Sequence, residues 1–262
     1  MESFDGVSSE YGAKSLVQRA AGRKLIDLLA FTGYESVLDV GCGPGHLTSA
    51  LTEVTSGRVL GADISGGMIS QACRDYPDIE FRRLAAEELD YQDEFDVVFC
   101  SSTLQWFSNA ADAVGAMYRA LKPGGRLGLA CPSTPEFAPW FSDIVRKVGA
   151  LPGIRETFAH WKPPWFHLPD RDAYRAFFEG QGFTTAYIEL DHEVSRHSVD
   201  EAFGIYSTGA AQGFIGRAYY DVDLTDEYLE SFSKAVCLEM ESRAAEGVVE
   251  VDFNRLYYIG HK

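Results

Sequence analysis

The sequence has few cysteines, no paired cysteine motif and no long apolar run. Its five cysteines are widely scattered, and no two of them form a C-x-x-C pair. We therefore expect neither a disulfide framework nor a zinc site, and a reducing, cytoplasmic setting is the simplest interpretation. No stretch of 18 or more apolar residues occurs, so no membrane-spanning helix is predicted. The first residues, Met1–Asp5, have neither a basic start nor an apolar run, which argues against a signal peptide.

Positive charge is also scarce. The chain has 23 Lys and Arg against 39 Asp and Glu, which gives a formal net charge of −16. Proteins bind phosphate backbones mainly through Lys and Arg, so nucleic acid is not an expected partner. The excess of acid is most simply a charge that keeps the protein in solution.

The first half of the chain alternates short apolar runs with amphipathic stretches. Strands that alternate with helices predict βαβ units and a mostly parallel sheet, so the expected fold class is α/β. At 262 residues the chain suits a single domain, 1–262, that carries insertions. The expected strands cover residues 36–40, 58–62, 79–84, 95–100 and 126–131, and the expected helices cover residues 15–31, 46–54, 67–76 and 110–121.

The rhythm changes after Pro132. Residues 133–169 hold six of the ten prolines and three of the four tryptophans, which is too aromatic for a disordered linker. Two segments, about 133–170 and 195–248, interrupt the alternation, and we expect both to form a largely helical cap over the ligand edge of the sheet. The remaining elements expected in this half are a helix over 170–181, a strand over 183–194, mostly helix over 199–247 and a last strand over 249–261.

A glycine-rich turn follows the first strand, in the run Val37-Leu-Asp-Val-Gly-Cys-Gly-Pro-Gly45. Ligands of open α/β sheets bind at the carboxyl ends of the strands, and glycines let the backbone approach them closely. The dinucleotide fingerprint G-x-G-x-x-G requires a third glycine where this chain has His46, so a pyrophosphate turn is disfavoured. The turn therefore predicts a site for a different nucleotide-like ligand.

The turn resembles motif I of the class I S-adenosylmethionine-dependent methyltransferases. The resemblance implies a Rossmann-like seven-stranded, mostly parallel sheet with helices on both faces, and S-adenosylmethionine as the cofactor. It also implies that Asp63, 20 residues after Gly43, holds the ribose hydroxyls, because a carboxylate can accept two hydrogen bonds from a diol. The alternative for Asp63 is a helix N-cap.

The same resemblance assigns further residues to the cofactor site. Asp39 would reach the methionine ammonium group, and Ile64 and Met68 would pack on the ribose and adenine, although Met68 fits a helix core equally well. Ala85 stands where many relatives have an aspartate, so backbone groups near Ala86 would have to bind the adenine amine. The remaining cofactor-binding positions that the resemblance implies are Gly41, Cys42, Gly43, Gly45, Glu87 and Ser101.

A narrower resemblance lies after the fourth expected strand. The pair Gln105-Trp106 is similar to the trans-aconitate methyltransferase and malonyl-carrier-protein methyltransferase group. That group has an N-terminal helix that closes over the cofactor, which implies a lid over about residues 4–31 with Tyr11 and Gln18 at the site. A solvated helix face is the alternative for Gln18 and Arg19.

The chemistry that the resemblance implies needs no catalytic metal, because the sulfonium cofactor is itself reactive. A general base is needed only if the acceptor is protonated at neutral pH, and a carboxylate is not. We therefore expect O-methylation of a small carboxylic acid. Arg217 is a candidate carboxylate clamp or else a surface ion pair, and His160 and His167 are candidate bases or else simply packed.

Two other functions stay open on the sequence alone. One is O- or N-methylation of a hydroxyl or amine in a natural product. The other is a non-catalytic, cofactor-binding or regulatory protein on the same fold, because a fold does not by itself determine a function.

Overall fold

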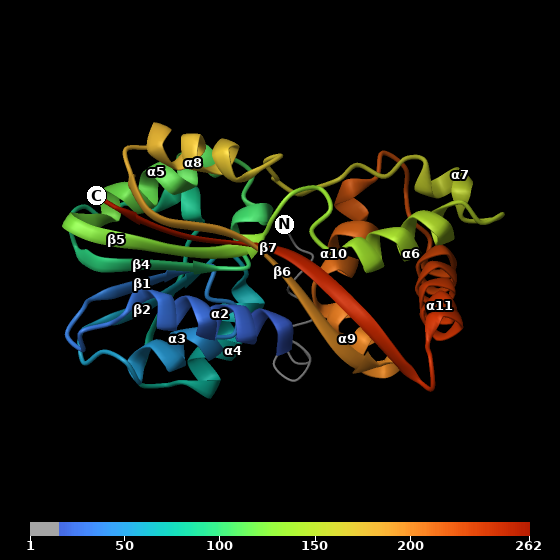
Figure 1. Ribbon diagram of the computed structural model, residues 1–262, viewed down its shortest axis with the longest axis horizontal. Coiled ribbons are helices and arrows are strands. Elements are labelled where there is room, and N and C mark those ends of the chain that lie inside the picture. Colours follow the sequence, from blue (N-terminus) through green and yellow to red (C-terminus); the bar gives the residue numbers. More distant parts are fainter. Residues whose placement is uncertain (1–15) are drawn as a thin grey trace.

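The computed structural model describes residues 16–262, in which seven strands form one sheet with helices on both faces (Figure 1). The strand order is β3-β2-β1-β4-β5-β7-β6, and only β7 runs antiparallel to its neighbours β5 and β6. The expected α/β fold with a mostly parallel sheet is therefore confirmed. The strands are β1 (Val37–Val40), β2 (Val59–Asp63), β3 (Glu80–Arg83), β4 (Phe95–Ser101), β5 (Leu121–Pro132), β6 (Thr184–Ser198) and β7 (Val248–His261).

The helices cover the sheet in two layers. On one face lie α2 (Leu16–Leu29), α3 (His46–Thr52) and α4 (Gly66–Asp75), and on the other lie α5 (Ala110–Ala120) and α8 (Arg171–Gly180) (Figure 1). Strands buried on both faces are mostly apolar, which explains the sequences of β1 and β4, in which Asp39 and Asp96 are the charged residues.

Strand β5 is longer than the sequence indicates. The sequence predicts a strand over 126–131, whereas β5 begins at Leu121. The pairing of β5 with β4 starts at Leu121 opposite Phe95 and then shifts register before Val97 opposite Arg126. Gly124, at φ +80°, permits this irregularity, so residues 122–125 lie within the strand and do not precede it.

Strands β6 and β7 extend well past the rest of the sheet. They pair from Thr184 opposite His261 to Ser198 opposite Val248, so this pair of antiparallel strands reaches into a second lobe beyond the carboxyl ends of the parallel strands (Figure 1). The helices of this lobe are α6 (Pro139–Gly149), α7 (Arg155–Phe158), α9 (Val199–Thr208), α10 (Ala210–Ile215) and α11 (Asp226–Arg243).

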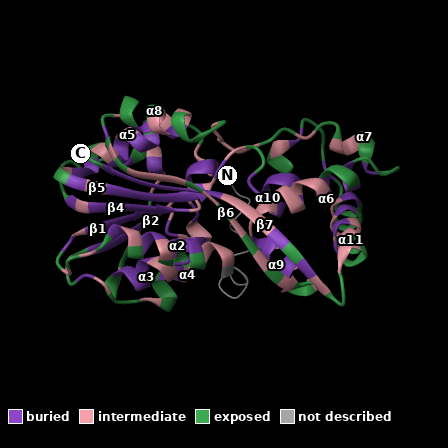
Figure 2. Cartoon of the chain, in the orientation of Figure 1, coloured by how far each residue is buried: buried purple, intermediate pink, exposed green. Residues whose placement is uncertain are grey.

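The second lobe has its own buried interior (Figure 2). Helices from both interrupting segments share it, with Phe141 on α6 and Phe232 on α11 almost fully buried. Phe158 stacks between Trp161, at 5.5 Å between ring centroids, and Phe232, at 5.6 Å. The aromatic residues of the proline-rich segment therefore build this core. No helix within residues 16–262 combines the length and the apolarity needed to cross a membrane.

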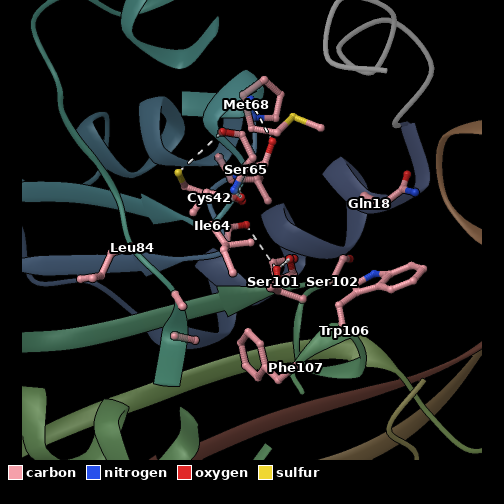
Figure 3. A pocket seen from close by; sticks show the side chains of 18 of the residues that line it. Gln18, Cys42, Ile64, Ser65, Met68, Leu84, Ser101, Ser102, Trp106 and Phe107 are labelled. Carbon is pink, nitrogen blue, oxygen red and sulfur yellow. Dashed lines mark hydrogen bonds between the residues drawn. The ribbon is translucent and has the colours of Figure 1, made fainter. Parts of the chain in front are cut away.

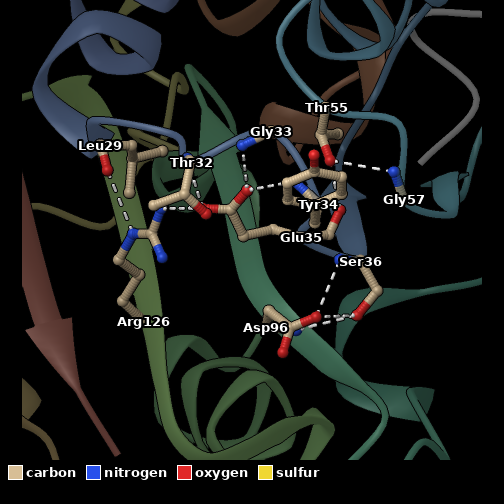
Figure 4. Close-up of polar contacts among 10 residues, drawn as sticks. All are labelled: Leu29, Thr32, Gly33, Tyr34, Glu35, Ser36, Thr55, Gly57, Asp96 and Arg126. Atoms are coloured by element: carbon tan, nitrogen blue, oxygen red, sulfur yellow. Dashed lines mark hydrogen bonds and ion pairs between the residues drawn. The ribbon is translucent and has the colours of Figure 1, made fainter.

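A buried acid, Glu35, holds the loop before β1 (Figure 4). Its carboxylate accepts hydrogen bonds from the backbone of Thr32, Gly33 and Tyr34 at 2.8–3.1 Å, and from Arg126 on β5 at 3.1 Å. Burial by itself would raise the pKa of Glu35, but these hydrogen bonds lower it to about 2. The network fixes the entry of the chain into β1, the strand that ends at the glycine turn.

The Glu35→Gln variant tests this network. An acid whose folded pKa lies below its unfolded value stabilises the fold fully above pH 4.5, and this contribution is lost as the pH falls towards 2. We expect E35Q to lower the free energy of unfolding at pH 7 by about 2 kcal/mol, with a smaller difference from the parent at pH 3, in urea denaturation. Glu94→Gln, at an exposed ion pair with Arg58, is the matched control and should change little. Equal stability of E35Q and parent at both pH values would contradict the account.

Candidate functional site

The glycine turn after β1 has a left-handed backbone at each of its three glycines. Gly41, Gly43 and Gly45 have φ of +74°, +55° and +87°. A Cβ atom at Gly41 would lie 2.2 Å from Thr103 Cγ2, and one at Gly45 would lie 2.8 Å from Phe81 Cζ. At Gly43 no atom of residues 16–262 beyond its chain neighbours lies within 4 Å of such a Cβ, so this glycine faces open space in the described structure. Close packing behind the turn and an open front are what a backbone cradle for a ligand requires.

Asp63, at the end of β2, holds the turn in place. Its Oδ2 accepts a hydrogen bond from the Gly43 N–H at 2.9 Å, and its Oδ1 accepts one from the Ser65 N–H at 2.8 Å. Ser65 is the N-cap of α4 and accepts a hydrogen bond from the Met68 N–H at 3.2 Å. The N-cap is thus Ser65, and Asp63 instead connects two neighbouring strand ends.

The glycine turn opens on a cavity of about 170 Å³, which we call the first cavity (Figure 3). Residues that follow β1, β2, β3 and β4 line it, together with Gln18 and Arg19 of α2. Met68 and Ser65 lie on one side, and Ser101, Ser102 and Trp106 lie on the other (Figure 3). The cavity therefore sits at the carboxyl ends of four adjacent parallel strands, where open α/β sheets bind their ligands.

A second cavity of about 60 Å³ borders the first and shares Gln18, Ser102 and Trp106 with it. Both lobes contribute to its wall, which is mostly apolar. The other residues that line it are Val17, Gln105, Pro132, Phe137, Phe141, Trp165, His167, Ile205, Thr208, Gly209, Ala210, Phe253 and Arg255.

Arg255 is the cation of the second cavity's wall, and the sequence analysis missed it. Its side chain is 3% exposed, and within residues 16–262 neither its Nε nor the rest of the guanidinium makes a hydrogen bond. Glu193 Oε2 lies 3.5 Å from its Nε, and the Phe253 ring centroid lies 5.7 Å from its Cζ. A buried guanidinium with unused donors is costly, so a partner for it is expected in the cavity.

His167 and Gln105 are among the uncharged polar side chains that line the same cavity. Burial lowers the pKa of His167 to about 4, although the nearby Pro132 carbonyl favours its protonated form, so the ring is neutral near pH 7. His167 stacks on Phe137 with 5.4 Å between the ring centroids. Gln105 Nε2 donates to the Ser102 carbonyl at 2.8 Å, and its Oε1 has no partner among the described residues.

The chain is similar to known methyltransferases. A family model described as a methyltransferase domain matches residues 38–129. A trans-aconitate 2-methyltransferase of Methylobacterium nodulans is 26% identical over 92% of this chain and 93% of its own length. A malonyl-[acyl-carrier protein] O-methyltransferase of Acetivibrio thermocellus is 32% identical over 47% of this chain and 46% of its own. Residues 38–129 therefore resemble a methyltransferase domain, and the chain is similar to the class I S-adenosylmethionine-dependent methyltransferases.

A solved methyltransferase structure has the same fold. The geranyl diphosphate C-methyltransferase of Streptomyces coelicolor, in complex with S-adenosyl-L-homocysteine, superposes with a TM-score of 0.54 over 93% of this chain and 75% of that one, at 14% identity. S-adenosylmethionine is the cofactor. The first cavity fits it, because the open side of Gly43 and the carboxylate of Asp63 face a nucleoside-sized space.

Most of the residues that the sequence assigned to the cofactor lie in the wall of the first cavity. Their individual contacts with the cofactor stay predictions. Trp106 lines both cavities, and Gln105 lines only the second. The predicted residues in the first wall are Gln18, Gly41, Cys42, Gly43, Asp63, Ile64, Met68, Ala86, Glu87, Ser101 and Trp106.

Three further predicted positions are not among the residues of the first cavity's wall. Tyr11 lies outside the described residues. Asp39 is 2% exposed behind the turn and does not line the first cavity. Burial raises the pKa of Asp39 to about 7, although the Thr48 hydroxyl donates to it at 2.7 Å, and its contact with a methionine ammonium stays a prediction. Gly45 is the N-cap of α3 and faces the Phe81 ring, not the cavity.

Two of the residues predicted to bind or deprotonate the methyl acceptor lie outside the walls of both cavities. Arg217 is more than half exposed and donates to Asp226 and to the Leu224 carbonyl, so it is the surface ion pair and not the carboxylate clamp. His160 is 48% exposed and its Nδ1 lies 2.6 Å from Asp221 Oδ1. The pairing of Arg217 with Asp226 and of His160 with Asp221 explains both positions.

Replacement of Asp63 tests the cofactor site. We expect Asp63→Ala to weaken S-adenosylmethionine binding by about 1–3 kcal/mol, because the hydrogen bonds to the turn and to the ligand are both lost. Calorimetric titration measures this, and thermal unfolding shows whether the fold is retained. Asp78→Ala, at an exposed acid in the turn before β3, should bind as the parent does. Unchanged affinity in D63A would rule out the assigned role.

Proposed function

We propose that the protein methylates a carboxylate oxygen of a small organic acid bound in the second cavity. The observation that carries the proposal is Arg255, a buried guanidinium without hydrogen bonds in the described chain, in a cavity that borders the cofactor cavity. Guanidinium groups bind carboxylates through two parallel hydrogen bonds, and such pairs are strongest where water is excluded. Two relatives are named for carboxylic acceptors, trans-aconitate and malonyl-[acyl-carrier protein], and the chain covers nearly all of the first and about half of the second. Both names support a carboxylic acid as the acceptor.

The reaction asks little of the protein beyond position. The cofactor supplies an activated methyl group on a positively charged sulfur, so the new carbon–oxygen bond forms as the carbon–sulfur bond breaks and its electron pair stays on sulfur. A carboxylic acid with a pKa near 4 has already lost its proton at neutral pH, so no side chain has to remove one. Arg255 would orient the carboxylate, and the shared wall of Gln18, Ser102 and Trp106 would bring it to the cofactor.

A hydroxyl acceptor is the second candidate, because His167 lines the same cavity and is neutral. Its pKa of about 4 makes it a weak base. Removal of a phenol proton, with a pKa near 10, would be uphill by about six pKa units, or roughly 8 kcal/mol. A proton acceptor is better matched when its pKa lies near the working pH. The balance therefore favours an acceptor that is already an anion.

The variant Arg255→Met tests the proposal. With methyl-labelled S-adenosylmethionine and carboxylic acids such as benzoate and hexanoate, the parent should form an alkali-labile methyl ester. R255M should lose about 10- to 150-fold in kcat/KM for the acid and keep its affinity for the cofactor, because a charge-assisted hydrogen-bond pair contributes about 1.5–3 kcal/mol.

Arg196→Met is the matched control for R255M. Arg196 lies on β6, the strand that pairs with β7, but its side chain is 73% exposed and is 3.9 Å from Glu250. We expect its kinetics to match those of the parent. Alkali-stable label on phenols or amines, with none on acids, would favour the second candidate. Equal kcat/KM in R255M and R196M would refute the role of Arg255.

A further inference from the structure

The charge of the second cavity restricts its acceptor more closely than the word acid does. Its wall within the described chain contains one guanidinium, Arg255, and no lysine. The only other titratable side chain in that wall is His167, which is uncharged near neutral pH. A single carboxylate therefore uses all of the positive charge that the wall offers.

Part of that positive charge is already balanced. Glu193 on β6 lies 3.5 Å from Arg255 Nε, and the Tyr257 hydroxyl donates to Glu193 Oε1 at 2.9 Å, which holds the carboxylate beside the guanidinium. Opposite charges this close neutralise much of each other's field at a distance. A second carboxylate on the acceptor would thus meet no further cation in the described wall of the second cavity.

The rest of the wall is suited to an apolar body. Phe137, Phe141, Trp165, Ile205 and Phe253 supply hydrophobic surface from the second lobe. Phe137 packs edge-on against Trp165 with 5.2 Å between ring centroids, and stacks on His167. Burial of a charge against such a surface is far more costly than burial of carbon, so the wall penalises any second anionic group.

We propose that the acceptor is a monocarboxylic acid with an apolar body, and that the Arg255–Glu193 pair sets this preference by offering anchorage to one negative charge only. The inference rests on the proposed function for the reaction, but it concerns binding and can be measured without turnover. It separates this chain from its relative named for trans-aconitate, an acceptor with three carboxyl groups.

Matched acids test the preference directly on the parent protein. In calorimetric titrations with S-adenosylhomocysteine present, benzoate should bind at least about tenfold more tightly than benzene-1,4-dicarboxylate, and hexanoate more tightly than hexanedioate. Equal or tighter binding of the dicarboxylates would overturn the inference. Selective binding without any ester product would instead refute the proposed reaction and leave the binding preference intact, so the two failures are distinguishable.

The Glu193→Gln variant tests the mechanism of selection. Glutamine keeps an oxygen that accepts from Tyr257 but removes the negative charge, so dicarboxylates should gain affinity relative to monocarboxylates by about three- to tenfold. Glu189→Gln is the matched control, because Glu189 lies on the same strand and pairs with Lys24 at 3.7 Å, outside both cavity walls. An unchanged ratio in E193Q, with thermal unfolding like that of the parent, would refute the role of Glu193.

Discussion

The pairing of β7 with both β5 and β6 determines how the two lobes meet. Along one face of β7, alternate residues pass from the second-lobe core at Val251 and Phe253 to the α2 core at Tyr257 and Ile259. Arg255 occupies the same register between them, opposite Pro132 of β5 and Asp191 of β6. A slip of one residue would turn this face over, so the ladder places a cation at the boundary between the lobes.

The two cavities divide the work that a methyl transfer requires. The first is built around the glycine turn, where Asp63 and the close packing behind Gly41 restrict the backbone. The second is built from aromatic side chains of both lobes around one buried charge. Gln18, Ser102 and Trp106 line both, so the two cavities meet at these side chains.

The sequence predicts the first cavity well because its determinants are local. The run from β1 through Gly41 to α3, and the spacing from Gly43 to Asp63, both express one βαβ unit. The second cavity could not be found in this way, because His167, Phe253 and Arg255 come from distant parts of the sequence and line one cavity only in the folded chain. One signal was present: Arg255 interrupts an alternating apolar pattern of Val249, Val251, Phe253, Tyr257 and Ile259. The choice of Arg217 was wrong because an aromatic neighbourhood in sequence did not reveal its pairing with Asp226.

The account depends most on where an acid binds relative to the cofactor. A crystal structure of the protein with S-adenosylhomocysteine and benzoate tests this directly. We predict that the homocysteine derivative lies on the turn from Gly41 to Gly45, and that the benzoate carboxylate accepts hydrogen bonds from Arg255 in the second cavity. Benzoate bound elsewhere, with Arg255 still facing only Glu193, would contradict the account.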